Sequence, residues 1–347
     1  MAGFLLYFFR MTSVKAEPAA AGQAEKEAEL IGHASVAAFL DKAWHGGRLA
    51  HAYLFVGPEH VGKMTAARHL ARLVLGGGTP LARHPDLLVV ERGRDAKTGK
   101  FHADIVLDQV HALRGWLARG ALLGGWKVAV IDGAQYLNKE AANALLKSLE
   151  EPQPRTLIIL LTDAADRIYP TIRSRCQTVV LGRVRRAEIA AALARTGLDQ
   201  ARAELFARLA EGCPGRALGL AQDPAAFADL DAKRRLLLDL TEAPLADRWL
   251  LLDKAVPAKL SFNEAAEQAR LTVDLLAGLL RDALLAAYGR PESLVNADLA
   301  PRLVAWAGKL GPARIAAALE EAAAAKRRLE ENVSPRAALE NLALVFK

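Results

Sequence analysis

The sequence predicts an α/β domain built on a parallel sheet, followed by a small helical lid and an all-α C-terminal region. Three observations predict this fold class. Short, continuous apolar runs alternate with segments of helical periodicity in the first half of the chain, which is typical of a parallel sheet covered on both faces. A Gly-x-x-x-x-Gly-Lys sequence follows the first apolar run directly. From about residue 183 onward only helical patterns remain.

The first two strands flank a glycine-rich loop and a helix. His51–Gly57 is predicted to be a short buried strand, with a helix and a Gly-Gly break before it, and Met64–Leu75 to be the helix that follows the loop. The second strand is predicted at Asp86–Arg92. A polar loop is expected over Arg92–Ile105.

Three further strands alternate with helices. Residues 107–122 have the apolar spacing of a helix. Another helix is predicted from Asn138, a suitable N-cap, to a stop at Pro152. The predicted strands are Trp126–Asp132, Thr156–Thr162 and Gln177–Leu181. Because ligands of such sheets bind at the carboxyl ends of the strands, we expect Gly57, Asp132 and Thr162 to lie together.

Length and composition indicate a globular chain of several domains. The 347 residues are 52% hydrophobic and 24% charged, enough for a large core. The predicted segments are a flexible polar leader at 1–28, in which Met11 is a second candidate start, a P-loop α/β domain at 29–182, a helical lid at 183–223 and a helical domain at 224–347.

Charge and cysteine content restrict the environment and the partners. The net charge of +7 and the pI near 9.5 are compatible with nucleic acid nearby. However, solvated helix faces explain each basic cluster by itself, at 183–186, 233–235 and 326–328. Two cysteines exclude a disulfide framework and fit a reducing compartment. The apolar start is too short to span a bilayer and has no basic region before it, so we expect a cytoplasmic protein without membrane contact.

The loop at residues 57–65 is the first candidate site. In a phosphate-binding loop, backbone N–H groups surround the phosphates at a helix N-terminus, and a lysine reaches the terminal phosphates. The next residue normally supplies a hydroxyl to Mg²⁺. Here that residue is a methionine, whose thioether is a poor ligand for a hard cation, and a threonine hydroxyl comes one residue late. The candidate nucleotide contacts are Gly57, Pro58, Gly62, Lys63, Met64 and Thr65. We predict an intact phosphate cradle with a damaged metal seat; the alternative is a chance Gly-Lys turn.

Three residues outside the loop are further candidates. Asp132 ends a strand, where a carboxylate helps to hold Mg²⁺ in nucleoside triphosphatases, or it only caps the strand end. The next residue, normally a glutamate that activates water, is Gly133, and a positioned base contributes roughly 10²–10⁴-fold to a rate. Thr162 either contacts a γ-phosphate or is structural. Arg216 begins a predicted lid helix, from which it either reaches the nucleotide or stays on the surface.

Arg173 and Arg175 precede the fifth strand in the sequence Thr-Ile-Arg-Ser-Arg-Cys, and Arg175 is a separate candidate. An arginine supplied by a neighbouring subunit stabilises charge on a transferring phosphoryl group. Arg175 is therefore either such an arginine finger or a salt-bridge residue.

Three segments together resemble the AAA+ clamp-loader family of bacterial DNA polymerase III, and most closely its delta-prime type. They are "GPEHVGK", "AVIDGAQYLNKEAANALLKSLEEP" and "PTIRSRC", within a resemblance that extends from about Leu30 to Gln222. The C-terminal "LEENVSPRAALENLAL" is similar to the closing helix of that family's collar domain.

The resemblance implies an AAA+ module, a lid and a helical collar that joins a hetero-pentameric ring. It implies gamma/tau-type motor and delta-type wrench subunits as partners, with the sliding clamp and primer-template DNA contacted indirectly. In that family the delta-prime type is a largely non-hydrolysing stator, a component of the DNA-directed DNA polymerase holoenzyme, which donates an arginine finger during clamp loading in DNA replication. On this chain the finger corresponds to Arg175. ATP is then bound weakly, if at all, and not hydrolysed.

One departure from the family concerns zinc. Many members carry a four-cysteine zinc module after the loop helix, but the corresponding stretch here contains no cysteine, so we expect no zinc. Two alternatives remain. An active gamma/tau-type ATPase would need Thr65 and another acid to replace the missing groups. An unrelated P-loop kinase or DNA-repair ATPase would leave the Ser-Arg-Cys and Leu-Leu-Lys-Ser-Leu-Glu-Glu-Pro segments unexplained.

Overall fold

The computed structural model describes residues 30–93, 102–257, 259–331 and 333–346. The predicted leader at 1–28 and the choice between Met1 and Met11 lie outside these residues. Contacts divide the described chain into two compact units. Residues 30–192 and 212–216 form the sheet unit, whereas residues 193–211 and 217–346 form the helical unit. The predicted boundaries at 182 and 223 stay a prediction.

In the described part of the sheet unit, five parallel strands have the order β2-β3-β4-β1-β5. This confirms the predicted parallel sheet. Each predicted strand is present with its ends shortened by at most two residues: β1 (Ala52–Val56), β2 (Leu87–Val90), β3 (Lys127–Asp132), β4 (Thr156–Thr162) and β5 (Gln177–Val180).

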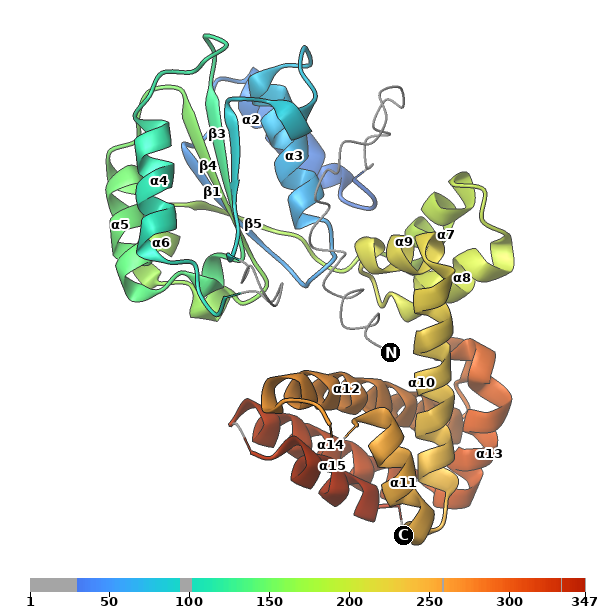
Figure 1. The fold of residues 1–347 in the computed structure, drawn as a ribbon. Coiled ribbons are helices and arrows are strands. Elements are labelled where there is room, and N and C mark those ends of the chain that lie inside the picture. Colours follow the sequence, from blue (N-terminus) through green and yellow to red (C-terminus); the bar gives the residue numbers. More distant parts are fainter. Residues whose placement is uncertain (1–29, 94–101, 258, 332, 347) are drawn as a thin grey trace. The chain divides into compact units, whose positions relative to one another are not determined.

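Helices cover both faces of this sheet (Figure 1). On one face lie α2 (Ala34–His45) and α3 (Lys63–Leu75); on the other lie α4 (Leu107–Leu117), α5 (Lys139–Glu150) and α6 (Pro170–Arg173). Short 3₁₀ turns occur at η1 (Leu81–Arg83), η2 (Ala134–Tyr136) and η3 (Ala165–Arg167).

The central strand β4 shows why the apolar runs are continuous. All seven of its residues are buried. Because side chains alternate between the two faces of a strand, Ile158 and Leu160 enter the core beneath α4 and α5, whereas Ile159 packs in the core beneath α2 and α3. A strand buried on both faces needs apolar residues at every position.

Helix α5 follows its sequence signals closely, whereas α4 is shorter than predicted. The side chain of Asn138 accepts a hydrogen bond from the backbone N–H of Ala141, as expected of the N-cap of α5. The helix predicted over 107–122 ends at Leu117 instead. The chain after it contains Gly120, Gly124 and Gly125, and glycine is unfavourable inside a helix.

The helical unit has its own apolar core, centred on the long helix α12. Among the described residues it contains helices and 3₁₀ turns and no strand. Its helices are α8 (Gln200–Leu209), α10 (Pro224–Glu242), α11 (Leu245–Ala255), α12 (Phe262–Ala287), α13 (Ala300–Leu310), α14 (Pro312–Glu330) and α15 (Pro335–Leu344), with η4 (Pro291–Ser293) and η5 (Ala297–Leu299) between α12 and α13. Helices α7 (Arg186–Arg195) and α9 (Pro214–Gln222) each contribute residues to both units. Within the described ranges, every helix is too short or too polar to cross a bilayer.

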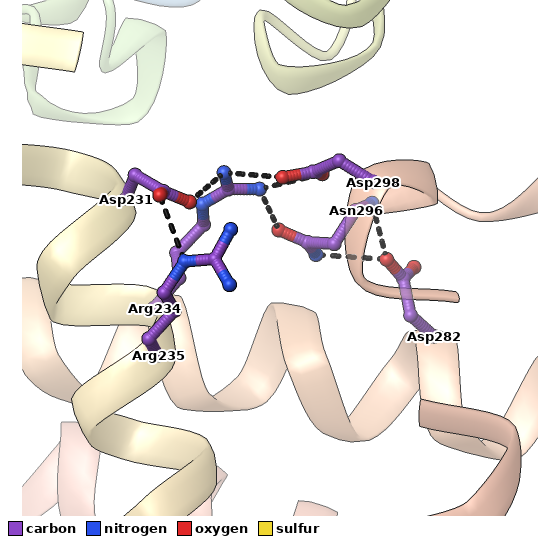
Figure 2. Close-up of polar contacts among 6 residues, drawn as sticks. All are labelled: Asp231, Arg234, Arg235, Asp282, Asn296 and Asp298. Atoms are coloured by element: carbon purple, nitrogen blue, oxygen red, sulfur yellow. Dashed lines mark hydrogen bonds and ion pairs between the residues drawn. The ribbon is translucent and has the colours of Figure 1, made fainter. Parts of the chain in front are cut away.

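A charged network joins α10 to the chain around η5 (Figure 2). The guanidinium of Arg234, only 1% exposed, donates to both carboxylate oxygens of Asp298 at 3.0 and 2.8 Å and to Asn296 Oδ1 at 3.1 Å. Asn296 in turn donates to the buried carboxylate of Asp282 on α12. Part of the basic cluster at 233–235 is therefore structural.

Candidate functional site

The glycine-rich loop lies between β1 and α3, at the carboxyl end of the sheet. Its glycines are required by the backbone. A Cβ on Gly57 would lie 2.4 Å from the carbonyl oxygen of Leu181, and Gly62 has φ +116°. Gly62 is also the N-cap of α3. Because it has no side chain, it does not cap the first N–H groups of this helix. This arrangement resembles that of a phosphate-binding loop, and phosphate binding by these residues stays a prediction.

Lys63 lies over this loop. Its ammonium donates to the carbonyl oxygens of Gly57 at 2.7 Å and Pro58 at 2.8 Å. An ammonium has three donors, so a third remains for a phosphate oxygen. Burial lowers the pKa of Lys63, while the carboxylates of Asp163 and Asp132 act in the opposite direction.

At the residue after Lys63, where a hydroxyl is expected to bind Mg²⁺, the side chain of Met64 carries no oxygen. Met64 is partly buried against the apolar core beneath α2 and α3. Thr65 follows one step along α3, about 100° around the helix axis from Met64. Among the described residues, no group of three or more His, Cys, Asp and Glu side chains is placed to hold a metal ion. The absence of zinc stays a prediction.

Asp132 ends β3 at the same edge of the sheet as Lys63. Burial raises the pKa of Asp132, and the charge of Lys63 opposes that rise. The backbone at Gly133 turns away with φ +81°, and a Cβ there would meet the Tyr136 ring at 2.8 Å. The residue that would supply a general base therefore lies in a turn whose backbone conformation favours glycine.

Asp163 is a site residue that the sequence analysis missed. Its carboxylate accepts a hydrogen bond of 2.6 Å from Nε2 of Gln135, and it is the carboxylate with the largest effect on the pKa of Lys63. The signal was available, because Asp163 directly follows Thr162 at the end of β4.

Thr162 and Arg216 reach this edge in different ways. Thr162 is 1% exposed, and its hydroxyl accepts a hydrogen bond from the N–H of Ala164 at 3.1 Å. Arg216 lies in the first turn of α9. The N–H of Gly215 donates to the carbonyl oxygen of His60 at 2.8 Å, and the charge of Arg216 contributes to lowering the pKa of His60 after the larger effect of burial. Arg216 is thus close to the loop.

Arg175 lies at the opposite edge of the sheet, where the parallel strands begin rather than end. It precedes β5, whose first residue pairs with Tyr53 near the start of β1, whereas Gly57 follows the end of β1. A strand of five residues at about 3.3 Å per residue separates these edges by about 16 Å. The structure therefore brings together the loop, Asp132, Thr162 and Arg216, but not Arg175.

The guanidinium of Arg175 is held by its own chain. It forms an ion pair of 2.6 Å with Glu150 and donates to the carbonyl oxygen of Thr171 at 2.9 Å and to the hydroxyl of Ser174 at 3.3 Å. The side chain is still 36% exposed. The salt bridge considered from the sequence is present, and its partner Glu150 was not identified there.

The strand order, a phosphate-binding loop after β1 and an acid at the end of β3 define a P-loop domain of the AAA+ type. The same fold occurs in a DNA polymerase III gamma subunit-related protein from Thermotoga maritima. The structural alignment covers 88% of this chain and 98% of the Thermotoga chain, with a TM-score of 0.51 and 16% sequence identity.

Sequence comparisons identify the family. The family described as "DNA polymerase III, delta subunit" matches residues 32–185, and "DNA polymerase III, delta subunit, C terminal" matches residues 245–347. The DNA polymerase III subunit delta' of Pseudomonas aeruginosa is 34% identical over 242 residues, which cover 63% of this chain and 70% of that protein. The Bacillus subtilis subunit delta' is 28% identical over 316 residues, covering 86% and 92%. This chain belongs to the DNA polymerase III subunit delta' family.

Proposed function

We propose that this chain is a non-hydrolysing clamp-loader subunit that supplies Arg175 to ATP bound by an adjacent motor subunit. The main support is the position of Arg175, across the sheet from the phosphate-binding loop of its own chain. An arginine supplied by a neighbour neutralises charge that develops on the transferring phosphoryl group. An arginine so far from its own loop and 36% exposed fits that task.

The chain's own nucleotide site supports a role without turnover. Lys63 and the loop backbone are arranged to hold phosphate. Met64 gives no oxygen to Mg²⁺, and Gly133 gives no general base. Weak binding of ATP without hydrolysis follows from this combination. The site residues of this proposal are Gly57, Pro58, Gly62, Lys63, Met64, Thr65, Asp132, Thr162 and Arg216.

The partners are proposed from the family. The chain joins gamma/tau-type motor subunits and a delta-type subunit in a cytoplasmic hetero-pentamer through its helical unit. The sliding clamp and primer-template DNA are contacted through that complex. The basic clusters argue little for direct DNA contact, since Lys326 and Arg328 form ion pairs with Asp274 and Glu321.

The test is ATP turnover by the reconstituted complex. Arg175→Ala should leave assembly intact and lower DNA-stimulated turnover by about 10³-fold, the range measured for arginines supplied in trans. Arg173→Ala, two residues away and exposed, is the matched control and should change turnover little. Unchanged turnover in Arg175→Ala would refute the proposal.

An active motor ATPase is the second candidate, favoured by the intact loop around Lys63. Steady-state phosphate release by the isolated chain, with and without primed DNA, separates the two candidates. The stator role predicts no turnover above background. Turnover that disappears in Lys63→Ala would establish the motor role instead.

A further inference from the structure

Glu150 and Arg175 come from different elements that meet at one edge of the sheet. Glu150 is the last residue of α5, and Arg175 lies between α6 and β5. Glu150 Oε1 and Arg175 Nη2 are 2.6 Å apart, and Nη1 of the same guanidinium is bound by Thr171 and Ser174. The guanidinium is thus held on one side by a carboxylate and on the other by α6.

The backbone that carries the Glu150 carboxylate is held in place by the packing of α5. Helix α5 is anchored through Leu145 and Leu149, which are 0% and 1% exposed within the sheet unit's core. Leu149 directly precedes Glu150, so the backbone that carries the carboxylate is immobilised by packing. A long arginine side chain loses rotamer entropy when it is fixed, and here that ordering occurs before any partner binds.

The remaining donors of Arg175 can face a ligand outside the chain. A guanidinium has five N–H donors. In the described residues, Nη1 has two acceptors and Nη2 has one, which leaves Nε–H and one N–H on Nη2. Each of these N–H groups can donate to a phosphate oxygen. The ion pair with Glu150 therefore orients the guanidinium and leaves two N–H donors available.

From this geometry we propose that Glu150 is a positioning residue for Arg175. Its carboxylate holds the guanidinium in the orientation in which it meets the triphosphate of the adjacent subunit. This inference rests on the proposed function of Arg175 as a finger. It adds that the finger is preorganised by its own chain, so part of its effect on turnover depends on a residue that touches no nucleotide.

Three variants of Glu150 and one control test this role in the reconstituted complex. Glu150→Ala removes the carboxylate, Glu150→Gln keeps an acceptor without the charge, and Glu150→Asp keeps the charge on a shorter stem. Glu151→Ala is the matched control, because Glu151 is the neighbouring exposed carboxylate and forms no ion pair with another residue that the structure describes. All four should assemble normally, since both acids lie on the surface at a helix end.

The expected readout is a separation of kcat from KM. Glu150→Ala should lower kcat for DNA-stimulated ATP turnover about tenfold and leave KM for ATP within about twofold, because the finger acts on the transition state. Glu150→Asp should recover most of the loss, Glu150→Gln little of it, and Glu151→Ala should match the unaltered protein. In an Arg175→Ala background, Glu150→Ala should have no further effect.

The outcomes separate this inference from the proposed function. If Arg175→Ala leaves turnover unchanged, the finger itself is refuted. If Arg175→Ala slows turnover while Glu150→Ala does not, or if Glu150→Ala slows it further when Arg175 is already absent, the finger stands and the positioning role is wrong. A changed KM or loss of assembly in both Glu150→Ala and Glu150→Gln would equally overturn it.

Discussion

At Gly133 two constraints act on one Cα. The residue has φ +81°, and a Cβ would lie 2.8 Å from Cδ2 of Tyr136. The guanidinium of Arg92 lies 3.8 Å from the centroid of the Tyr136 ring, so a shift of the ring would also disturb this cation–π contact. The sequence reveals the missing glutamate, but only the structure shows that a side chain at this position is disfavoured.

We therefore expect Gly133→Glu to destabilise the sheet unit without creating an ATPase. A non-glycine residue in the left-handed region costs about 1–2 kcal/mol, and the Tyr136 contact adds to this. Thermal unfolding together with phosphate release measures both effects. Gly133→Ala is the control, because it carries the same conformational penalty without a carboxylate. Turnover by Gly133→Glu at undiminished stability would contradict this prediction.

Met64 controls a different property, the use of Mg²⁺. Met64→Thr places a hydroxyl directly after Lys63, where an oxygen ligand is expected to bind the cation. We expect about tenfold tighter binding of ATP in the presence of Mg²⁺, equivalent to about 1.4 kcal/mol, and no change with a chelator. Calorimetric titration under both conditions measures this.

The control is Thr65→Val. It removes a hydroxyl that lies about 100° around the axis of α3 from the side chain of residue 64. It should leave the Mg²⁺ dependence of ATP binding unchanged. Equal gains for Met64→Thr with and without Mg²⁺ would show that the substitution acts on the loop rather than on a metal seat.

At the scale of elements, the strands could be predicted and one helix end could not. The run Thr156–Thr162 is apolar at each inner position because β4 is buried on both faces, so local sequence carries the signal. The helix over 107–122 ends five residues early, at Leu117, although its spacing continues. Helical periodicity marks which residues can face a core, whereas the end depends on glycines and on what the next residues contact.

The join between α10 and η5 depends on a buried charge rather than on apolar packing (Figure 2). Arg234→Met keeps the length of the side chain but leaves Asp298 and Asn296 without their donor. Removal of one partner of a buried ion pair typically costs about 3–5 kcal/mol, and we expect a loss of this size in the free energy of unfolding of the helical unit.

Arg235→Met is the matched control for this prediction. Arg235 is the next residue on α10 and is 56% exposed, and its one ion pair with a described residue is with Asp231, so its loss should cost about 1 kcal/mol or less. Urea denaturation followed by circular dichroism compares the two variants, with the two units allowed separate transitions. Equal effects would show that burial of Arg234 contributes nothing.

At the scale of the whole molecule, contiguous motifs were predictable and convergent contacts were not. Gly57 to Thr65 and Asp132 were found because the loop and the strand end carry their own signals. Asp163 and Glu150 were missed because their roles come from partners 28 and 25 residues away, at Gln135 and Arg175. A single sequence shows which residues can ionise, whereas the fold decides which of them meet.

The two units lead to a prediction about assembly. The sheet unit has apolar cores on both sheet faces, and the helical unit has a separate core around α12. Truncation after Gln222, before α10, removes most of the helical unit and keeps all of the sheet. We expect this truncated chain to stay folded in its sheet unit and to lose association with the other subunits, because the proposed collar contacts come from the helices removed.

Circular dichroism and co-elution with the reconstituted partners measure the two properties. Retained co-elution at full occupancy would place the assembly surface in the sheet unit and refute the collar role, whereas a chain that elutes alone and melts cooperatively separates assembly from folding.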